Sequence, residues 1–131
     1  LMSEEFKIEI VNPESSFYVN EGIIEAVVPA YEGEMGILKD HISIISFLKP
    51  GIIKVLTKTG EENFYVEDGI LEFKNNSLSI LTSIIMDLKN IDKSLLSENL
   101  KKAENELENT ELNDQTRFLI SQKVEILKSI N

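Results

Sequence analysis

The character of the chain changes near residue 87, and this change constrains the fold more than any other feature of the sequence. Before it, short apolar segments alternate with turns rich in Gly, Pro, Asn and Ser; after it, neither Pro nor Gly occurs. Apolar segments separated by turns at intervals of about ten residues are typical of sandwiches and barrels. We therefore predict a β-sandwich or flattened barrel of about eight to ten strands over residues 1–86, followed by an antiparallel two-helix hairpin over residues 87–131.

The first predicted strand shows the pattern most clearly. Phe6, Ile8 and Ile10 alternate with Lys7 and Glu9, as expected of a strand with one buried face. Further segments of this kind, each bounded by turn residues, follow along the chain. The predicted strands lie at residues 6–10, 17–19, 23–28, 42–48, 52–57, 63–66, 70–73 and 78–81, while residues 20–22 are predicted as a turn and residues 32–36 as a loop.

The last third of the chain has helical periodicity. Leu96, Leu100, Ala103 and Leu107 form a narrow stripe on one helix face, and Asp92 is a suitable N-cap for this helix. Residues 109–111 lack apolar support and mark the break. A second helix is predicted over residues 114–130, with a wider apolar band. A narrow stripe needs one partner, whereas a wide band can contact two.

Composition excludes several classes of function. There is no cysteine, and His41 and Arg117 are the only residues of their types, so we expect neither thiol chemistry nor a zinc site. The net charge of −10 is unsuited to nucleic acid, which requires a basic face. Most of this charge, −8, falls in residues 1–86, and this distribution favours protein partners. We predict no metal and no cofactor.

Two local patterns invite a functional interpretation. Asp40, His41 and Ser43 resemble the members of a catalytic triad, but neighbouring residues of a strand point to opposite faces, so we predict that the protein is not an enzyme. Met35 lies between two glycines of the predicted loop. It either belongs to an interaction surface or packs beneath its own loop.

Three motifs together resemble a known family. Residues 28–41 read VPAYEGEMGILKDH and residues 48–51 read LKPG, as in the E-G-x-x-G-I-L-x-x-H and L-K-P-G patterns of the epsilon subunit of F-type ATP synthase. Residues 66–73, VEDGILEF, are similar to the stretch before the last strands of that family, and Pro13 lies in a similar early turn. The resemblance covers essentially the whole chain, including the helical hairpin.

The resemblance implies a non-catalytic subunit of the central stalk, which rotates and couples proton flow to ATP synthesis. Its sandwich is expected to bind the gamma subunit and the ring of c subunits. By this resemblance Glu34 lies near the polar loop of the c ring, and the region from His41 to Ser43 lies near gamma. Met35, Gly36 and Ile42 are expected as neighbouring contacts.

The resemblance also implies a role for the hairpin. In bacterial relatives it folds against the sandwich or extends along gamma into the alpha/beta catalytic head, where it blocks ATP hydrolysis. Phe118 lies outside the apolar band, and we expect Phe118, Arg117 and Lys123 to contact a partner. The second helix either exchanges partners between sandwich and gamma, or simply packs against the first helix and the sandwich edge.

The start of the hairpin departs from the relatives that bind ATP. Those relatives carry an I-D-x-x-R-A pattern, whereas here Ile91 and Asp92 are followed by leucines at the Arg and Ala positions. Without the arginine there is no bidentate phosphate contact. We therefore predict weak or absent ATP binding.

A free-standing sandwich adaptor or carbohydrate-binding module is the alternative to a stalk subunit. Carbohydrate-binding modules present exposed aromatic rings, and this chain has no Trp and only three Tyr. We find no signal peptide and no apolar run of the length needed to cross a bilayer. The expected location is the cytoplasmic side of the bacterial inner membrane, with membrane contact only through the complex.

Overall fold

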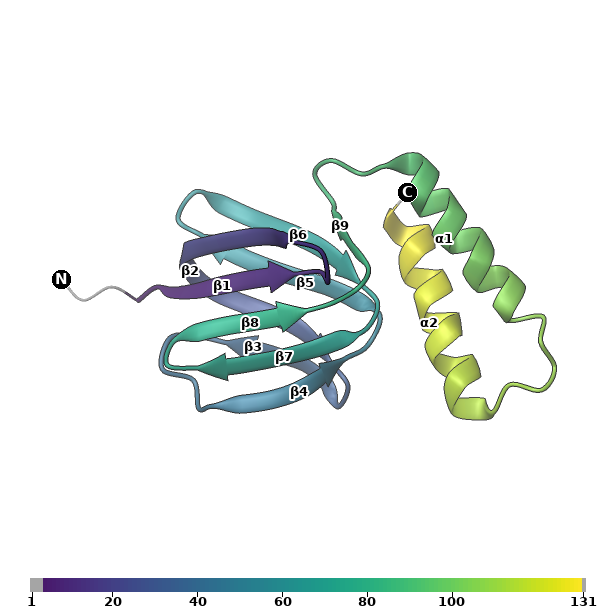
Figure 1. Cartoon of the computed structure of the whole chain (residues 1–131), viewed down its shortest axis with the longest axis horizontal. Helices are drawn as coiled ribbons and strands as arrows, with labels where there is room; N and C mark the ends of the chain where they lie inside the picture. The colour runs from purple at the N-terminus through teal and green to yellow at the C-terminus, as the bar shows by residue number, and fades with distance from the viewer. Residues whose placement is uncertain (1–3, 131) are drawn as a thin grey trace. The chain divides into compact units, whose positions relative to one another are not determined.

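The computed structural model describes residues 4–130 of the chain and shows strands followed by two helices (Figure 1). Contacts divide the chain into two units, one ending at Lys89 and the other beginning at Asn90, which are described separately. Within the described residues the elements are β1 (Phe6–Val11), β2 (Ser16–Ala30), β3 (Gly33–Ile37), β4 (Ile44–Leu48), β5 (Gly51–Thr57), β6 (Gly60–Val66), β7 (Gly69–Lys74), β8 (Ser77–Leu81), β9 (Ile85–Asp87), α1 (Lys93–Glu106) and α2 (Asp114–Ile130).

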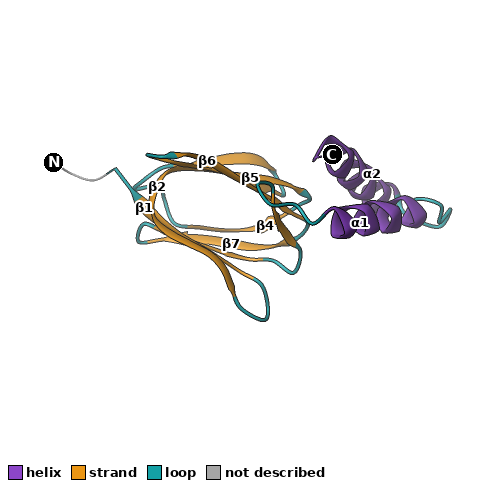
Figure 2. Ribbon diagram, turned by 90° about the horizontal axis from the view of Figure 1, so that it is seen from above, coloured by secondary structure: helices purple, strands orange, loops and turns teal. Residues whose placement is uncertain are grey.

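The strands form two layers around one apolar core, as Figure 2 shows for β6 and β7 in opposite layers. The strand order is β1-β8-β7-β4-β2-β5-β6-β9, and β3 pairs with β2. Because β1 also pairs with β2, the sheet folds back on itself, which confirms the predicted sandwich. The core is formed by the inward-facing residues Phe6, Ile8, Ile10, Ile23, Ala26, Val28, Ala30, Ile37, Leu48, Ile53, Val55, Phe64, Val66, Leu71, Phe73, Leu78 and Ile80.

Strand β2 is a single strand where the sequence predicts two strands and a turn. Its fifteen residues run through the predicted turn at residues 20–22. The Asn20 side chain accepts a hydrogen bond from the Gly22 amide at 2.7 Å, and the pairing register with β5 shifts between Ile23 and Glu25. Asn and Gly therefore mark an irregularity within a long strand, because β1 pairs with its first half and β5 with its second.

The predicted loop at residues 32–36 is also wrong, because Gly33–Ile37 forms strand β3. Met35 pairs with Val28, and its side chain packs partly buried against the core. The two glycines favour a loop when only neighbouring residues are considered. The backbone hydrogen bonds that β3 forms with β2 are a tertiary contact, and they override this local preference. The short strand β9, which pairs with β6, was not predicted, and β4 begins at Ile44 rather than at residue 42.

The hairpin confirms both predicted helices. The Asp92 carboxylate accepts hydrogen bonds from the backbone N–H groups of Ser94 (3.0 Å) and Leu95 (3.1 Å), so it caps α1 as expected. Asn113 has the same role before α2, where its side chain accepts from Thr116 N at 2.8 Å. The helices pack through a small cluster made of Ala103, Ile120 and Val124, flanked by Leu100, Leu107 and Leu112.

A half-buried polar network joins β2, β6 and the segment after β9. The Tyr18 hydroxyl donates to the Glu62 carboxylate and accepts from Asn20 Nδ2 at 2.9 Å. Lys89 Nζ lies 3.7 Å from Glu62, and the Lys89 amide donates to Asp87 Oδ1 at 2.9 Å. Burial and the bond to Glu62 raise the pKa of Tyr18 from 10.0 to about 12.

This raised pKa predicts a pH dependence of stability. Because the folded pKa of Tyr18 exceeds the unfolded one, the stabilisation is complete below pH 10.0 and is lost as pH rises to about 12. The difference in free energy of unfolding between the wild type and Tyr18→Phe should therefore be constant below pH 10.0 and shrink between there and about 12. Urea unfolding of both proteins across this pH range measures the difference in free energy of unfolding. A constant difference at every pH would contradict the prediction.

Candidate partner-binding surface

The outer face of strands β4, β7 and β8 carries large exposed apolar side chains. Ile45 is 72% exposed and Phe47 is 63% exposed on β4, with Ile70 and Leu81 also exposed on the neighbouring strands. The strand register places Phe47 opposite Ile70, Ile70 opposite Leu81, and Leu81 opposite Val11. These side chains form a continuous apolar row across four strands, which we call the apolar row (Phe47, Ile70, Leu81, Val11).

An open groove of about 600 Å³ lies along the apolar row at one end of the strands. Tyr31, from the turn between β2 and β3, borders it beside Phe47, and Asp68 and Ser83 border it at the loops. Ser83 Oγ donates to Asp68 Oδ1 at 3.3 Å, which joins these two loops. Exposed apolar surface of this extent, with a polar rim, is typical of a protein-binding site.

The charged residues that line the groove and its neighbour are acidic, although the outer face as a whole also carries Lys7 on β1 and Lys74 on β7. Of the residues that line the groove and its neighbour over β1, β7 and β8, the charged ones are Asp68, Glu9 and Glu72. The groove therefore suits a partner with an apolar centre and a basic residue opposite Asp68.

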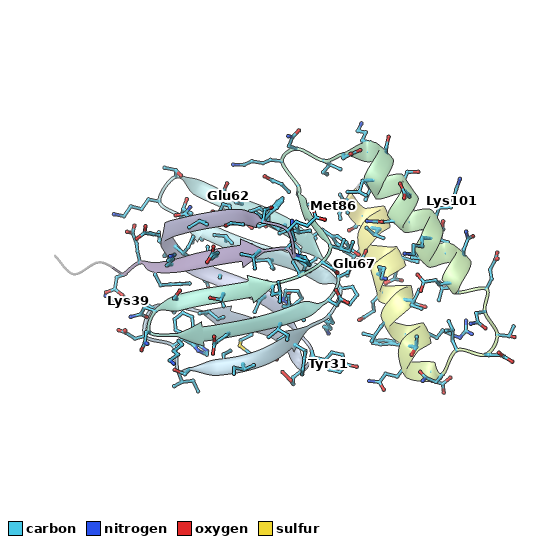
Figure 3. The ribbon with its side chains drawn as sticks, viewed as in Figure 1. Tyr31, Lys39, Glu62, Glu67, Met86 and Lys101 are labelled. Atoms are coloured by element: carbon cyan, nitrogen blue, oxygen red, sulfur yellow. The ribbon has the colours of Figure 1, made fainter. Side chains whose placement is uncertain are left out.

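The predicted contact residues fall into two groups that the fold does not bring together. Glu34 and Gly36 are exposed on β3, while Met35 is half-buried and packs against the core, so it lies in a strand rather than in the predicted loop, and its contact with a partner stays a prediction. His41, Ile42 and Ser43 follow in the loop after the far end of β3. Tyr31 and Lys39, which flank β3, lie at opposite ends of the sandwich in Figure 3.

The loop that carries His41 is held firmly in place. The Asp40 amide donates to Asn76 Oδ1 at 2.6 Å, and Asn76 Nδ2 donates to Asp40 Oδ1 at 2.9 Å. The His41 ring packs edge-to-face against the Phe73 ring, with 5.8 Å between the ring centroids. Its Nδ1 lies 2.8 Å from the Ile42 carbonyl oxygen. Because Asp40 engages Asn76, it does not orient His41 toward Ser43. The loop instead presents Ile42, which is 75% exposed.

The predicted hairpin contacts also occupy different environments. Phe118 is 60% exposed on α2, whereas the Arg117 guanidinium is engaged within the hairpin, with the carbonyl oxygens of Leu107 and Asn109. Lys123 is half-buried. At the start of α1, Ile91 is half-buried and the Asp92 carboxylate is occupied by its capping hydrogen bonds.

Within residues 4–130 the structure has no group of three or more His, Cys, Asp or Glu side chains arranged to hold a metal ion. In the same part of the chain, no helix is long and apolar enough to cross a membrane.

One pattern in the sequence indicates the exposed apolar row, although we did not predict the row from it. Residues 42–48 are apolar on both faces of a strand, apart from two serines. Such a strand either lies between two layers or exposes one apolar face. In the structure Ser46 and Leu48 point inward and Ile45 and Phe47 point outward, so the second case holds.

Known proteins resemble the chain over its whole length. A family model described as "ATP synthase, Delta/Epsilon chain, beta-sandwich domain" matches residues 5–87. An "ATP synthase epsilon chain" of Pelagibacter ubique (strain HTCC1062) is 64% identical over 130 residues, covering 99% of this chain and 100% of the relative. Another, from Rhizobium meliloti (strain 1021), is 31% identical over 118 residues, covering 89% of this chain and 87% of the relative.

Two solved structures share the fold. One chain in the cryo-EM structure of the Euglena gracilis mitochondrial ATP synthase, containing OSCP, F1 and c-ring, aligns with a TM-score of 0.70 at 20% identity, over 98% of this chain and 79% of that chain. A chain from the Tetrahymena thermophila mitochondrial ATP synthase, described as central stalk and c-ring, aligns with a TM-score of 0.64 at 12% identity, over 94% of this chain and 93% of that chain. At these identities the likeness concerns the fold.

Proposed function

The chain belongs to the ATP synthase epsilon-chain family, and from this premise we propose that it is a non-catalytic rotor subunit of the central stalk, coupling proton flow through the c ring to ATP synthesis. The observation that carries the proposal is the apolar row across β4, β7, β8 and β1. A subunit that transmits torque must bind its neighbours tightly. A continuous apolar surface supplies that affinity, and it needs no catalytic group.

We assign the apolar row and its groove to the gamma subunit. The loop with His41, Ile42 and Ser43 and the exposed edge at Glu34 form two further contacts, at the two ends of β3. Glu34 is the contact proposed for the polar loop of the c ring, where an acidic side chain would set orientation more than affinity. Through these partners the subunit is held peripherally at the cytoplasmic side of the bacterial inner membrane.

Reconstitution with the gamma subunit tests this assignment. The two purified proteins, mixed at equal concentration, are expected to elute together on size-exclusion chromatography as a complex with one copy of each. Elution as two separate proteins, with both folded by circular dichroism, would refute the central-stalk assignment.

We also propose that the hairpin restrains ATP hydrolysis through the alpha/beta head. Phe118 supports this role, because an aromatic ring 60% exposed on a helix is available to a partner. Limited proteolysis of the assembled enzyme with and without ATP tests whether the hairpin changes its environment. The same cleavage of the hairpin in both states would argue against the proposal.

The isolated protein should not bind ATP with micromolar affinity. The Asp92 carboxylate caps α1 through Ser94 N and Leu95 N, and Leu95 and Leu96 stand where ATP-binding relatives have Arg and Ala. No guanidinium is therefore available there to grip a phosphate. Isothermal titration calorimetry of the full chain with MgATP should show no saturable heat. A saturable isotherm in the micromolar range would contradict the prediction.

A further inference from the structure

The one arginine of the chain joins the two helices of the hairpin. Arg117, in the first turn of α2, donates from Nη1 to the Leu107 carbonyl oxygen at 2.9 Å and from Nη2 to the Asn109 carbonyl oxygen at 2.7 Å. Leu107 is the C-cap of α1, and Asn109 lies two residues further on, in the connection between the helices. The planar guanidinium fork therefore spans the C-cap carbonyl of α1 and a carbonyl of the connection.

The Leu107 carbonyl is one of those that an α-helix leaves without a partner. The last carbonyls of a helix lack intrahelical donors and carry the negative end of the helix dipole. Helix α1 has no basic residue in its own last turn. Because the Glu108 and Asn109 amides already donate to the Asn105 and Glu106 carbonyl oxygens, Arg117 adds the hydrogen bond at the Leu107 carbonyl and a positive charge that the last turn of α1 lacks.

Two further contacts hold the helices together beyond this point. Ala103 of α1 packs in a buried cluster with Ile120 and Val124 of α2. Lys128 Nζ lies 3.7 Å from Glu104 Oε2, which links α1 to the last turn of α2. Separation of the helices would expose the cluster and remove the Arg117 hydrogen bond from the Leu107 carbonyl at the end of α1.

We propose that Arg117 is a positioning residue that clamps the hairpin, so that α1 and α2 engage their partner as one closed body and do not separate. Arg117 then acts inside the hairpin, and the partner meets the outer surface of the closed pair, where Phe118 is exposed. The part of this proposal that concerns the assembled enzyme rests on the function proposed above. The clamp itself is a property of the free chain.

The clamp is tested in the free, full-length chain by amide hydrogen exchange. Arg117→Ala should speed exchange in the last turn of α1, at residues 103–107, by about tenfold, because hydrogen bonds to a charged group are lost. Lys102→Ala, at an exposed position on α1, is the matched control and should leave exchange there unchanged. Arg117→Lys, which keeps the charge but not the fork, should fall between them. Equal exchange in Arg117→Ala and Lys102→Ala would overturn the clamp.

The closed state is tested by a distance within the hairpin. Because the chain has no cysteine, Lys101→Cys with Glu125→Cys takes spin labels only at two exposed sites on different helices, and it leaves the ion pair between Glu104 and Lys128 in place. The label distance is expected to be the same in the free chain and in the complex with gamma and the catalytic head. An increase of about one helix diameter, ~10 Å, on assembly would overturn the proposal.

The outcomes separate this inference from the proposed function. If the labelled chain assembles and the distance grows, the stalk assignment stands and the closed hairpin is refuted. If neither the labelled nor the parent chain assembles, the stalk assignment fails. Hydrogen exchange in the free chain then decides whether Arg117 clamps the helices.

Discussion

Replacing Phe47 with aspartate is expected to abolish binding to the gamma subunit, with an affinity loss of roughly a thousandfold, or about 4 kcal/mol. Phe47 lies at one end of the apolar row, opposite Ile70 and beside the groove at Tyr31. Its ring is 63% exposed in the free chain, so binding would bury it. The substituted carboxylate would be buried against an apolar partner, beside a groove whose charged lining residue, Asp68, is also acidic.

Binding of the Phe47→Asp variant to immobilised gamma subunit, compared with the wild type, measures this effect. The matched control is Leu56→Asp on β5, an exposed apolar residue on the outer face of the other layer. Both variants should retain the wild-type circular dichroism spectrum, because neither side chain belongs to the core. Wild-type affinity in Phe47→Asp, or equal losses in the two variants, would remove the apolar row as the gamma-binding surface.

Gly69→Ala is expected to be the most destabilising small substitution in the sandwich, costing about 4 kcal/mol in free energy of unfolding. Gly69 begins β7 with φ at +149°, a conformation that side chains rarely adopt. An added Cβ would lie only 2.0 Å from the Leu81 carbonyl oxygen. Leu81 is the ladder partner of Ile70, so the backbone would have to move at the junction of β7 and β8.

Gly60→Ala separates backbone strain from steric overlap. Gly60 has φ at +142°, nearly the same conformation, but an added Cβ would meet no atom within 4 Å. This control should cost only about 1–2 kcal/mol, the strain of the conformation alone. Urea unfolding of both variants gives the two values. Equal losses would show that the overlap at Leu81 is relieved without cost.

The binding surface could be predicted only in part. The motif at residues 32–41 predicts contacts with partners, because its resemblance to the family is specific, and this stays a prediction. It could not indicate that Glu34 and His41 lie at opposite ends of β3, since a strand separates residues that are close in sequence. Nor could it indicate that Phe47 and Leu81 share one face with Ile70, because that depends on the pairing of β4, β7 and β8.

Local chemistry was enough for the hairpin. The stripe from Leu96 to Leu107, the cap at Asp92 and the break at residues 109–111 are all short-range features, and α1 and α2 begin where they indicate. The hydrogen bonds of Arg117 to the end of the first helix and the connection after it could not be predicted from short-range features. Its carbonyl partners, Leu107 and Asn109, are eight to ten residues away and become neighbours only when the hairpin closes.

The sequence by itself determined the division into strands and helices, the acidic character of the sandwich and the family, because periodicity, caps and motifs are written in neighbouring residues. The tertiary structure decided the rest. Pairing with distant strands turned the glycine-rich stretch into β3 and the predicted turn at residues 20–22 into part of β2. It also decided which apolar side chains face outward, because strand register assigns every second residue to the core and leaves the others for a partner.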